Sequence, residues 1–66
     1  MIEQILDHAL RDRLAAAGCY PKRPAPGGDE IWFTPHLNRD FTVERRVTDA
    51  TTANAVLRRA GMEEAF

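Results

Sequence analysis

A glycine-led pair of short aromatic segments constrains the fold of this chain more than any other feature. Gly27-Gly28 leads into the run 29–35 (DEIWFTP), the polar turn 36–40 (HLNRD) follows, and the alternating run 41–43 (FTV) returns. Glycine permits an irregular backbone entry, and a side-chain period of two is typical of β-strands. The segment therefore predicts a β-hairpin, which carries the chain's only Trp.

The alternation in this hairpin also predicts which side chains are buried. Ile31 and Phe33 share one face of their strand, and Phe41 and Val43 share one face of the next. We expect these four side chains to form the core beneath the first helix. The opposite, open face then carries Trp32, Thr34, Thr42 and Glu44. The indole there is either part of a partner surface or a group covered by the C-terminal tail.

Two amphipathic helices flank the strands. Apolar residues recur at helical spacing near the N-terminus and predict a helix over about 2–17, closed by Gly18: Ile2, Ile5, Leu6, Ala9, Leu10, Leu14 and Ala17. A second helix is expected over about 50–60, with an N-cap at Thr48, Asp49 or Thr51 and a stop at Gly61 followed by an apolar contact from Met62. Its apolar stripe consists of Ala53, Val56, Leu57 and Ala60.

A third strand is predicted at 19–23, before the loop 24–28. Pro21 cannot donate a ladder hydrogen bond, which places this strand at a sheet edge. With 66 residues the chain has room for one modest core, so we expect a single domain over 1–66. The predicted class is α+β in the order α-β-β-β-α, a three-stranded antiparallel sheet with two helices on one face.

Composition narrows the classes of function. Nine Lys and Arg against ten Asp and Glu give a net charge of −1, so bulk electrostatics supply no general attraction to nucleic acid or membrane. The single Cys19 excludes an internal disulfide and favours a reducing compartment. No apolar run approaches the roughly 20 residues needed to span a bilayer. We expect a soluble cytoplasmic protein with no membrane association, metal or cofactor.

The cations are unevenly distributed along the chain. Seven of the nine lie outside the first predicted helix: Lys22, Arg23, Arg39, Arg45, Arg46, Arg58 and Arg59. If the strand ends and the second helix converge, these residues form a local patch that contacts the phosphates of RNA. The carboxylates Asp29, Glu30, Asp40 and Glu44 are interleaved with them, so surface ion pairing is an equal alternative.

Two short features bear on catalysis. The glycine pair is neither a phosphate-binding loop nor a dinucleotide fingerprint, because no Gly-Lys-Ser/Thr follows it and a strand comes next. We interpret Gly27 and Gly28 as permitting an irregular entry into the strand. His36 lies at the hairpin tip beside Asn38 and Arg39, where it is either an ordinary turn residue or a catalytic imidazole.

The element order, the strand 27–35, the return 38–43 and the ending 52–62 (TANAVLRRAGM) together resemble the HicA family of toxins over nearly the whole chain. The resemblance implies a fold like that of double-stranded-RNA-binding domains, RNA binding, ribosome-independent mRNA cleavage and a HicB-like antitoxin as partner. The family's functional mark is a histidine shortly after a glycine, usually in the sequence Gly-Ser-His, that opens the strand after the first loop.

At that position this chain has Gly27-Gly28-Asp29. An exposed aspartate has a pKa near 4 and repels a phosphate, whereas an imidazole titrates near neutrality and can act as general base or acid. The resemblance therefore makes Asp29 and His36 the candidate catalytic residues of a ribonuclease whose activity is weak or lost. The alternative is a non-catalytic module that binds RNA or a protein through the Trp32 face and the arginines.

Overall fold

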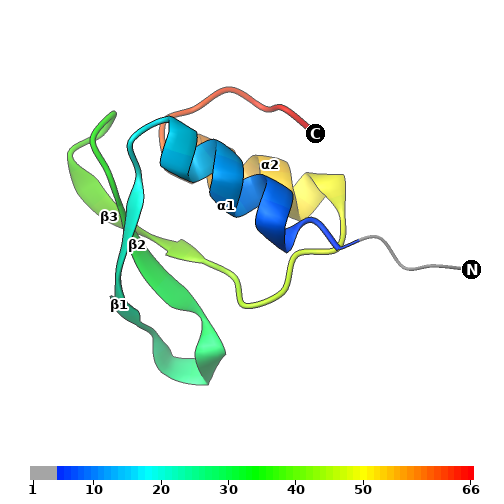
Figure 1. The fold of residues 1–66 in the computed structure, drawn as a ribbon, viewed down its shortest axis with the longest axis horizontal. Coiled ribbons are helices and arrows are strands. Elements are labelled where there is room, and N and C mark those ends of the chain that lie inside the picture. The colour runs from blue at the N-terminus through cyan, green and yellow to red at the C-terminus, as the bar shows by residue number, and fades with distance from the viewer. Residues whose placement is uncertain (1–4) are drawn as a thin grey trace, which may run out of the picture.

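The computed structural model describes residues 5–66. Its elements are, in order, α1 (Asp7–Ala16), β1 (Tyr20–Pro24), the short 3₁₀ turn η1 (Pro26–Gly28), β2 (Glu30–Thr34), β3 (Arg39–Val43) and α2 (Ala50–Arg59). The strands form one antiparallel sheet in the order β1-β2-β3. Figure 1 shows both helices on one side of the sheet, with the far turn of the β1–β2 hairpin projecting away from them. The predicted α+β class and element order are confirmed.

The buried face of β2 is the opposite of the one predicted. Trp32 is 4% exposed and Thr34 is fully buried, whereas Ile31 and Phe33 are only partly buried. On β3 the prediction is correct, because Phe41 and Val43 are buried. Trp32 therefore packs in the core beneath the helices and is not on the open face.

The length of the turn between the strands explains this inversion. Four residues, 35–38, separate Thr34 from Arg39, and these two residues pair across the hairpin. Directly opposed residues in an antiparallel ladder point to the same face, so the pairing continues as Trp32 with Phe41. A core of Ile31, Phe33, Phe41 and Val43 would require an odd number of turn residues, because a shift of one residue exchanges the faces of a strand.

Helix α1 begins later than predicted because its first turn is bonded to the segment after β3. The Leu6 amide donates to the Val47 carbonyl (2.8 Å), and the Val47 amide donates to Asp7 Oδ1 (2.6 Å). Of the apolar residues predicted to form one face, Leu6, Leu10 and Leu14 are buried, while Ile5 is 48% exposed. The predicted start at residue 2 lies outside the described residues.

Both helices end in the same glycine motif. Gly18 and Gly61 have φ values of +91° and +80°, the left-handed conformation that closes a helix. After α1, Cys19 N donates to the Leu14 carbonyl (3.0 Å), and after α2, Met62 N donates to the Leu57 carbonyl (2.9 Å). Met62 packs against the core, as predicted. At the other end of α2, Asp49 is the N-cap, and it accepts from Thr52 N (3.1 Å).

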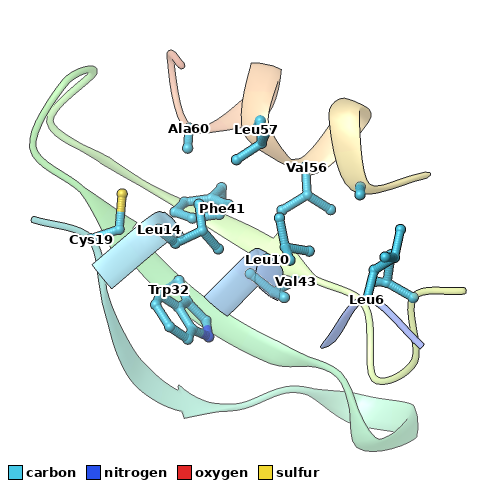
Figure 2. Close-up of a cluster of buried hydrophobic side chains, with 12 residues drawn as sticks. Leu6, Leu10, Leu14, Cys19, Trp32, Phe41, Val43, Val56, Leu57 and Ala60 are labelled. Carbon is cyan, nitrogen blue, oxygen red and sulfur yellow. The ribbon is translucent and has the colours of Figure 1, made fainter. Parts of the chain in front are cut away.

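A single hydrophobic cluster joins the helices to the inner face of the sheet (Figure 2). Leu10 and Leu14 of α1 and Val56 and Leu57 of α2 belong to this cluster together with Trp32, Phe41 and Val43 of the sheet. The C-terminal tail lies along α2 instead of over the sheet, because the Asn54 side chain bonds to the backbone of Ala65 and Phe66. Within residues 5–66, no helix is long and apolar enough to cross a membrane.

Candidate functional site

Asp29, the first candidate catalytic residue, borders a shallow hollow at the far end of the β1–β2 hairpin. The hollow is lined by Pro21, Lys22, Arg23, Pro24, Gly28, Asp29 and Glu30. Both strands contribute to it, β1 with two cations and the entry to β2 with two carboxylates. It is therefore a polar surface with charges of both signs.

The glycine pair shapes this end of the hairpin. Gly27 and Gly28 both have positive φ values, +80° and +87°, and the loop closes through a hydrogen bond from Ala25 N to the Asp29 carbonyl (2.8 Å). A Cβ on Gly28 would lie 2.6 Å from Cδ of Arg45, so the Arg45 side chain crosses directly over this glycine. The predicted irregular entry is confirmed, and it brings a cation from beyond β3 to the loop.

The Asp29 carboxylate binds backbone. Its Oδ1 accepts from the amide of Arg45 at 2.9 Å, which links the start of β2 to the residues that follow β3. The cations around Asp29 thus come from two places, with Lys22 and Arg23 on β1 and Arg45 beside Gly28. An anion in the hollow would meet these cations, while the Asp29 and Glu30 charges would oppose it.

Glu30 joins the sheet to α1. Its Oε1 accepts from Arg11 Nε (3.1 Å), Arg11 Nη2 (2.9 Å) and the Trp32 indole Nε1 (3.2 Å). The hydrogen bond from Trp32, followed by those from Arg11, lowers the pKa of the Glu30 carboxyl below its ordinary value, because each favours the charged form. Glu30 therefore stays ionised at neutral pH, and its charge is compensated within the fold.

His36 lies at the other end of β2 from Asp29. Its Nε2 is 3.0 Å from the carbonyl oxygen of Ala17, the residue that ends α1, and its backbone amide donates to Thr34 Oγ1 (3.2 Å). The five residues of β2 span about 16 Å at the usual rise of a strand. The two candidate catalytic residues are therefore not brought into one centre.

Four of the seven predicted RNA-binding cations pair with carboxylates. Lys22 and Arg23 both contact Asp40, at 3.2 and 3.6 Å. Arg58 pairs with Glu64, and Arg59 pairs with Glu44 beside the β3 edge. In the part of the chain that the structure describes, no carboxylate lies within ion-pair distance of the remaining three, which are Arg39, Arg45 and Arg46.

Two aromatic residues outside the predicted site lie on the open face of the sheet. Tyr20 is 51% exposed, and its ring centroid lies 5.4 Å from that of Phe33. The sequence signal that identifies them is the even length of the turn 35–38, which places Trp32 inside and Phe33 outside. The open face of the sheet therefore carries Tyr20 and Phe33, and the prediction that it carries Trp32 is wrong.

Comparisons of the chain with protein families, with curated proteins and with solved structures find no match. Among residues 5–66, no group of three or more His, Cys, Asp or Glu side chains is arranged to hold a metal ion.

Proposed function

We propose that this protein is a HicA-like, RNA-binding component of a toxin–antitoxin pair whose ribonuclease activity is weak or lost. The observation that carries the proposal is the set of cations around Asp29, the position of the family's histidine. Lys22 and Arg23 line the same hollow as Asp29, and Arg45 crosses over the adjacent Gly28. Cations held around a backbone loop are suited to contact the phosphates of RNA.

The chemistry at this position supports weak or absent cleavage. The Asp29 carboxylate accepts a hydrogen bond from the Arg45 amide, and His36 is at the opposite end of β2. Attack of a ribose 2′-hydroxyl on the adjacent phosphate requires a base within hydrogen-bond reach of that hydroxyl. The negative charge of a carboxylate repels the phosphate that it would have to approach, and His36 is too distant to assist.

The element order supports the same assignment. The arrangement α-β-β-β-α, with two helices on one side of a three-stranded sheet, agrees with what the resemblance implies. A HicB-like antitoxin is the partner that belongs to this proposal, and co-expression of such a protein from a neighbouring reading frame would test it.

The proposal predicts that RNA binding and RNA cleavage are separable in this chain. We expect the intact protein to bind short RNA in a salt-dependent manner and to cleave it slowly or not at all. Asp29→His restores an imidazole at the family's position and should raise the cleavage rate of the same labelled RNA, measured by gel electrophoresis. The matched control is Asp29→Asn, which loses the same hydrogen-bonding charge but supplies no base.

Two results would contradict this proposal. The first is a lack of RNA binding by the intact chain at low salt. The second is rapid cleavage of RNA by the intact chain, and if Asp29→Asn and His36→Ala leave that cleavage unchanged, neither candidate residue takes part in it. Induction in a bacterial host gives a cellular measurement, in which Asp29→His should slow growth more than the intact chain does.

A further inference from the structure

The face of the sheet opposite the helices carries an ordered array of aromatic and cationic side chains. The strand register forms two adjacent rows on this face. One row contains Tyr20, Phe33 and Asp40, and the other contains Arg23, Ile31 and Thr42. We call these six residues, with Lys22, the open face.

An irregularity in β1 brings the cations onto this face. The register shifts between Pro21 and Arg23, so that Lys22 is the extra residue of a bulge and Arg23 pairs with Ile31. Without the extra residue, Arg23 would oppose Glu30 and point toward the helices. Lys22 Nζ lies 5.7 Å from the centre of the Phe33 ring, within the range of a cation–π contact.

Tyr20 is accessible on this face, and the Phe33 ring beside it is partly buried. Tyr20 is 51% exposed, and its ring is tilted by 35° from that of Phe33, with 5.4 Å between the centroids. An exposed ring on a sheet, backed by a second ring and flanked by cations, is suited to stack a base while the cations contact the neighbouring phosphates. Among the residues of the open face, the two cations Lys22 and Arg23 outnumber the single carboxylate, Asp40.

The two edges of the sheet are poorly suited to pairing with an added strand. A ligand is therefore more readily bound on the open face than at an edge. Pro21 and Pro24 lack the backbone N–H that a paired strand requires, so β1 is unsuited to strand addition by a partner protein. At the other edge, Arg59 Nη1 donates to the Thr42 carbonyl of β3 at 3.1 Å. Both edges are thus obstructed, while the face between them is uncovered.

We infer that the open face binds single-stranded RNA, with bases stacked on Tyr20 and Phe33 and phosphates contacted by Lys22 and Arg23. This inference deepens the proposed function and rests on it, because it names the surface and the strandedness of the RNA. Asp40 then acts as a negative regulator of affinity, since it holds both cations in ion pairs that a phosphate must displace.

The test measures the fluorescence anisotropy of a labelled single-stranded RNA of about ten nucleotides at several salt concentrations. Tyr20→Leu should weaken binding about tenfold through the loss of one stacked base, whereas Tyr20→Phe keeps the ring and the affinity. Arg23→Gln should weaken binding and lower the salt slope by about 0.7, the value for one lost phosphate contact on a single strand. Asp40→Asn should tighten binding several-fold by freeing Lys22 and Arg23.

Arg13→Gln is the matched control, because Arg13 is an exposed arginine on α1, away from the open face. It should leave the affinity unchanged, and circular dichroism should show that every variant is folded. If the intact chain binds RNA but Tyr20→Leu and Asp40→Asn, which lie outside the hollow beside Asp29, bind equally well, the open face is not the site and the proposed function stands. Preference for a duplex of the same sequence would overturn the single-strand assignment, and no RNA binding at low salt would overturn both proposals.

Discussion

At the scale of single residues, Glu30 is the side chain whose role is least evident from the sequence. One carboxylate oxygen receives hydrogen bonds from Arg11 of α1 and from the indole of Trp32. A buried indole N–H needs an acceptor, and Glu30 supplies it two residues earlier on the same strand. Glu30 is thus a structural contact between α1 and the sheet, although it also lines the candidate hollow.

This role predicts a pH-dependent effect of Glu30→Gln on stability. The pKa of Glu30 is lowered in the folded state from an ordinary value of 4.5, so its charged form stabilises the protein above that pH. The contribution is lost as the pH falls through the lowered folded-state pKa. At pH 7 we expect Glu30→Gln to reduce the free energy of unfolding by about 1 kcal/mol, because the pair is partly exposed.

Urea unfolding followed by Trp32 fluorescence measures this difference. The gap between the intact chain and Glu30→Gln should close in acid below pH 4.5. The control is Glu63→Gln, the same change at an exposed tail residue, which should show no such dependence. An equal loss of stability at all pH values would show that the charge of Glu30 makes no contribution.

At the scale of elements, the end of β2 and the turn that follows it join the C-terminal ends of both helices. Thr34 Oγ1 donates to the Ala60 carbonyl at the end of α2 (2.6 Å), and His36 Nε2 approaches the Ala17 carbonyl at the end of α1 (3.0 Å). A Cβ on Gly61 would lie 2.8 Å from Leu37, so the turn also packs tightly against this helix end. The last carbonyls of a helix have no partner within it, and here the turn supplies the partners.

The turn contact predicts that Thr34→Val is strongly destabilising despite its nearly equal volume. Thr34 is fully buried, and its loss leaves the Ala60 carbonyl without a donor, at a cost of about 1–3 kcal/mol. Thr42→Val is the matched control on the open face and should change the free energy of unfolding by about 0.5 kcal/mol or less. Thermal unfolding of both variants measures the difference, and similar midpoints would argue against the contact.

At the scale of the whole molecule, the sheet separates two environments. The helices cover the face that carries Trp32, Phe41 and Val43, and the face that carries Tyr20 and Phe33 is uncovered. The choice between these faces decides which aromatic residues are available to a ligand. RNA binding should therefore be detected through the labelled RNA, because Trp32 lies away from the proposed contact surface.

This arrangement predicts opposite solvent accessibilities for the single Trp and the single Tyr. Trp32 is 4% exposed, so its fluorescence should be blue-shifted and barely quenched by iodide. Tyr20 is 51% exposed and should react readily with a nitrating reagent in the folded protein. Bound RNA should protect Tyr20 from nitration and leave Trp32 quenching unchanged. Strong iodide quenching of Trp32 would show that the sheet presents the opposite face to solvent.

The sequence by itself determined the number, type and order of the elements, because these depend on local signals. Helical spacing indicated the two helices, the glycines at 18 and 61 indicated their C-terminal ends, and alternation indicated the strands on either side of the turn. The separation of Asp29 and His36 also follows from the sequence, because the two residues flank opposite ends of a predicted extended strand.

Only the tertiary structure decided which face of the sheet is covered. Either face of β2 is apolar enough to be buried, and the choice depends on the pairing register that the four-residue turn and the helices impose together. The start of α1 likewise depends on Val47, forty positions away in the sequence from the Asp7 that it contacts. The grouping of cations was not local either, because ion pairs with Asp40, Glu44 and Glu64 are contacts between separate segments.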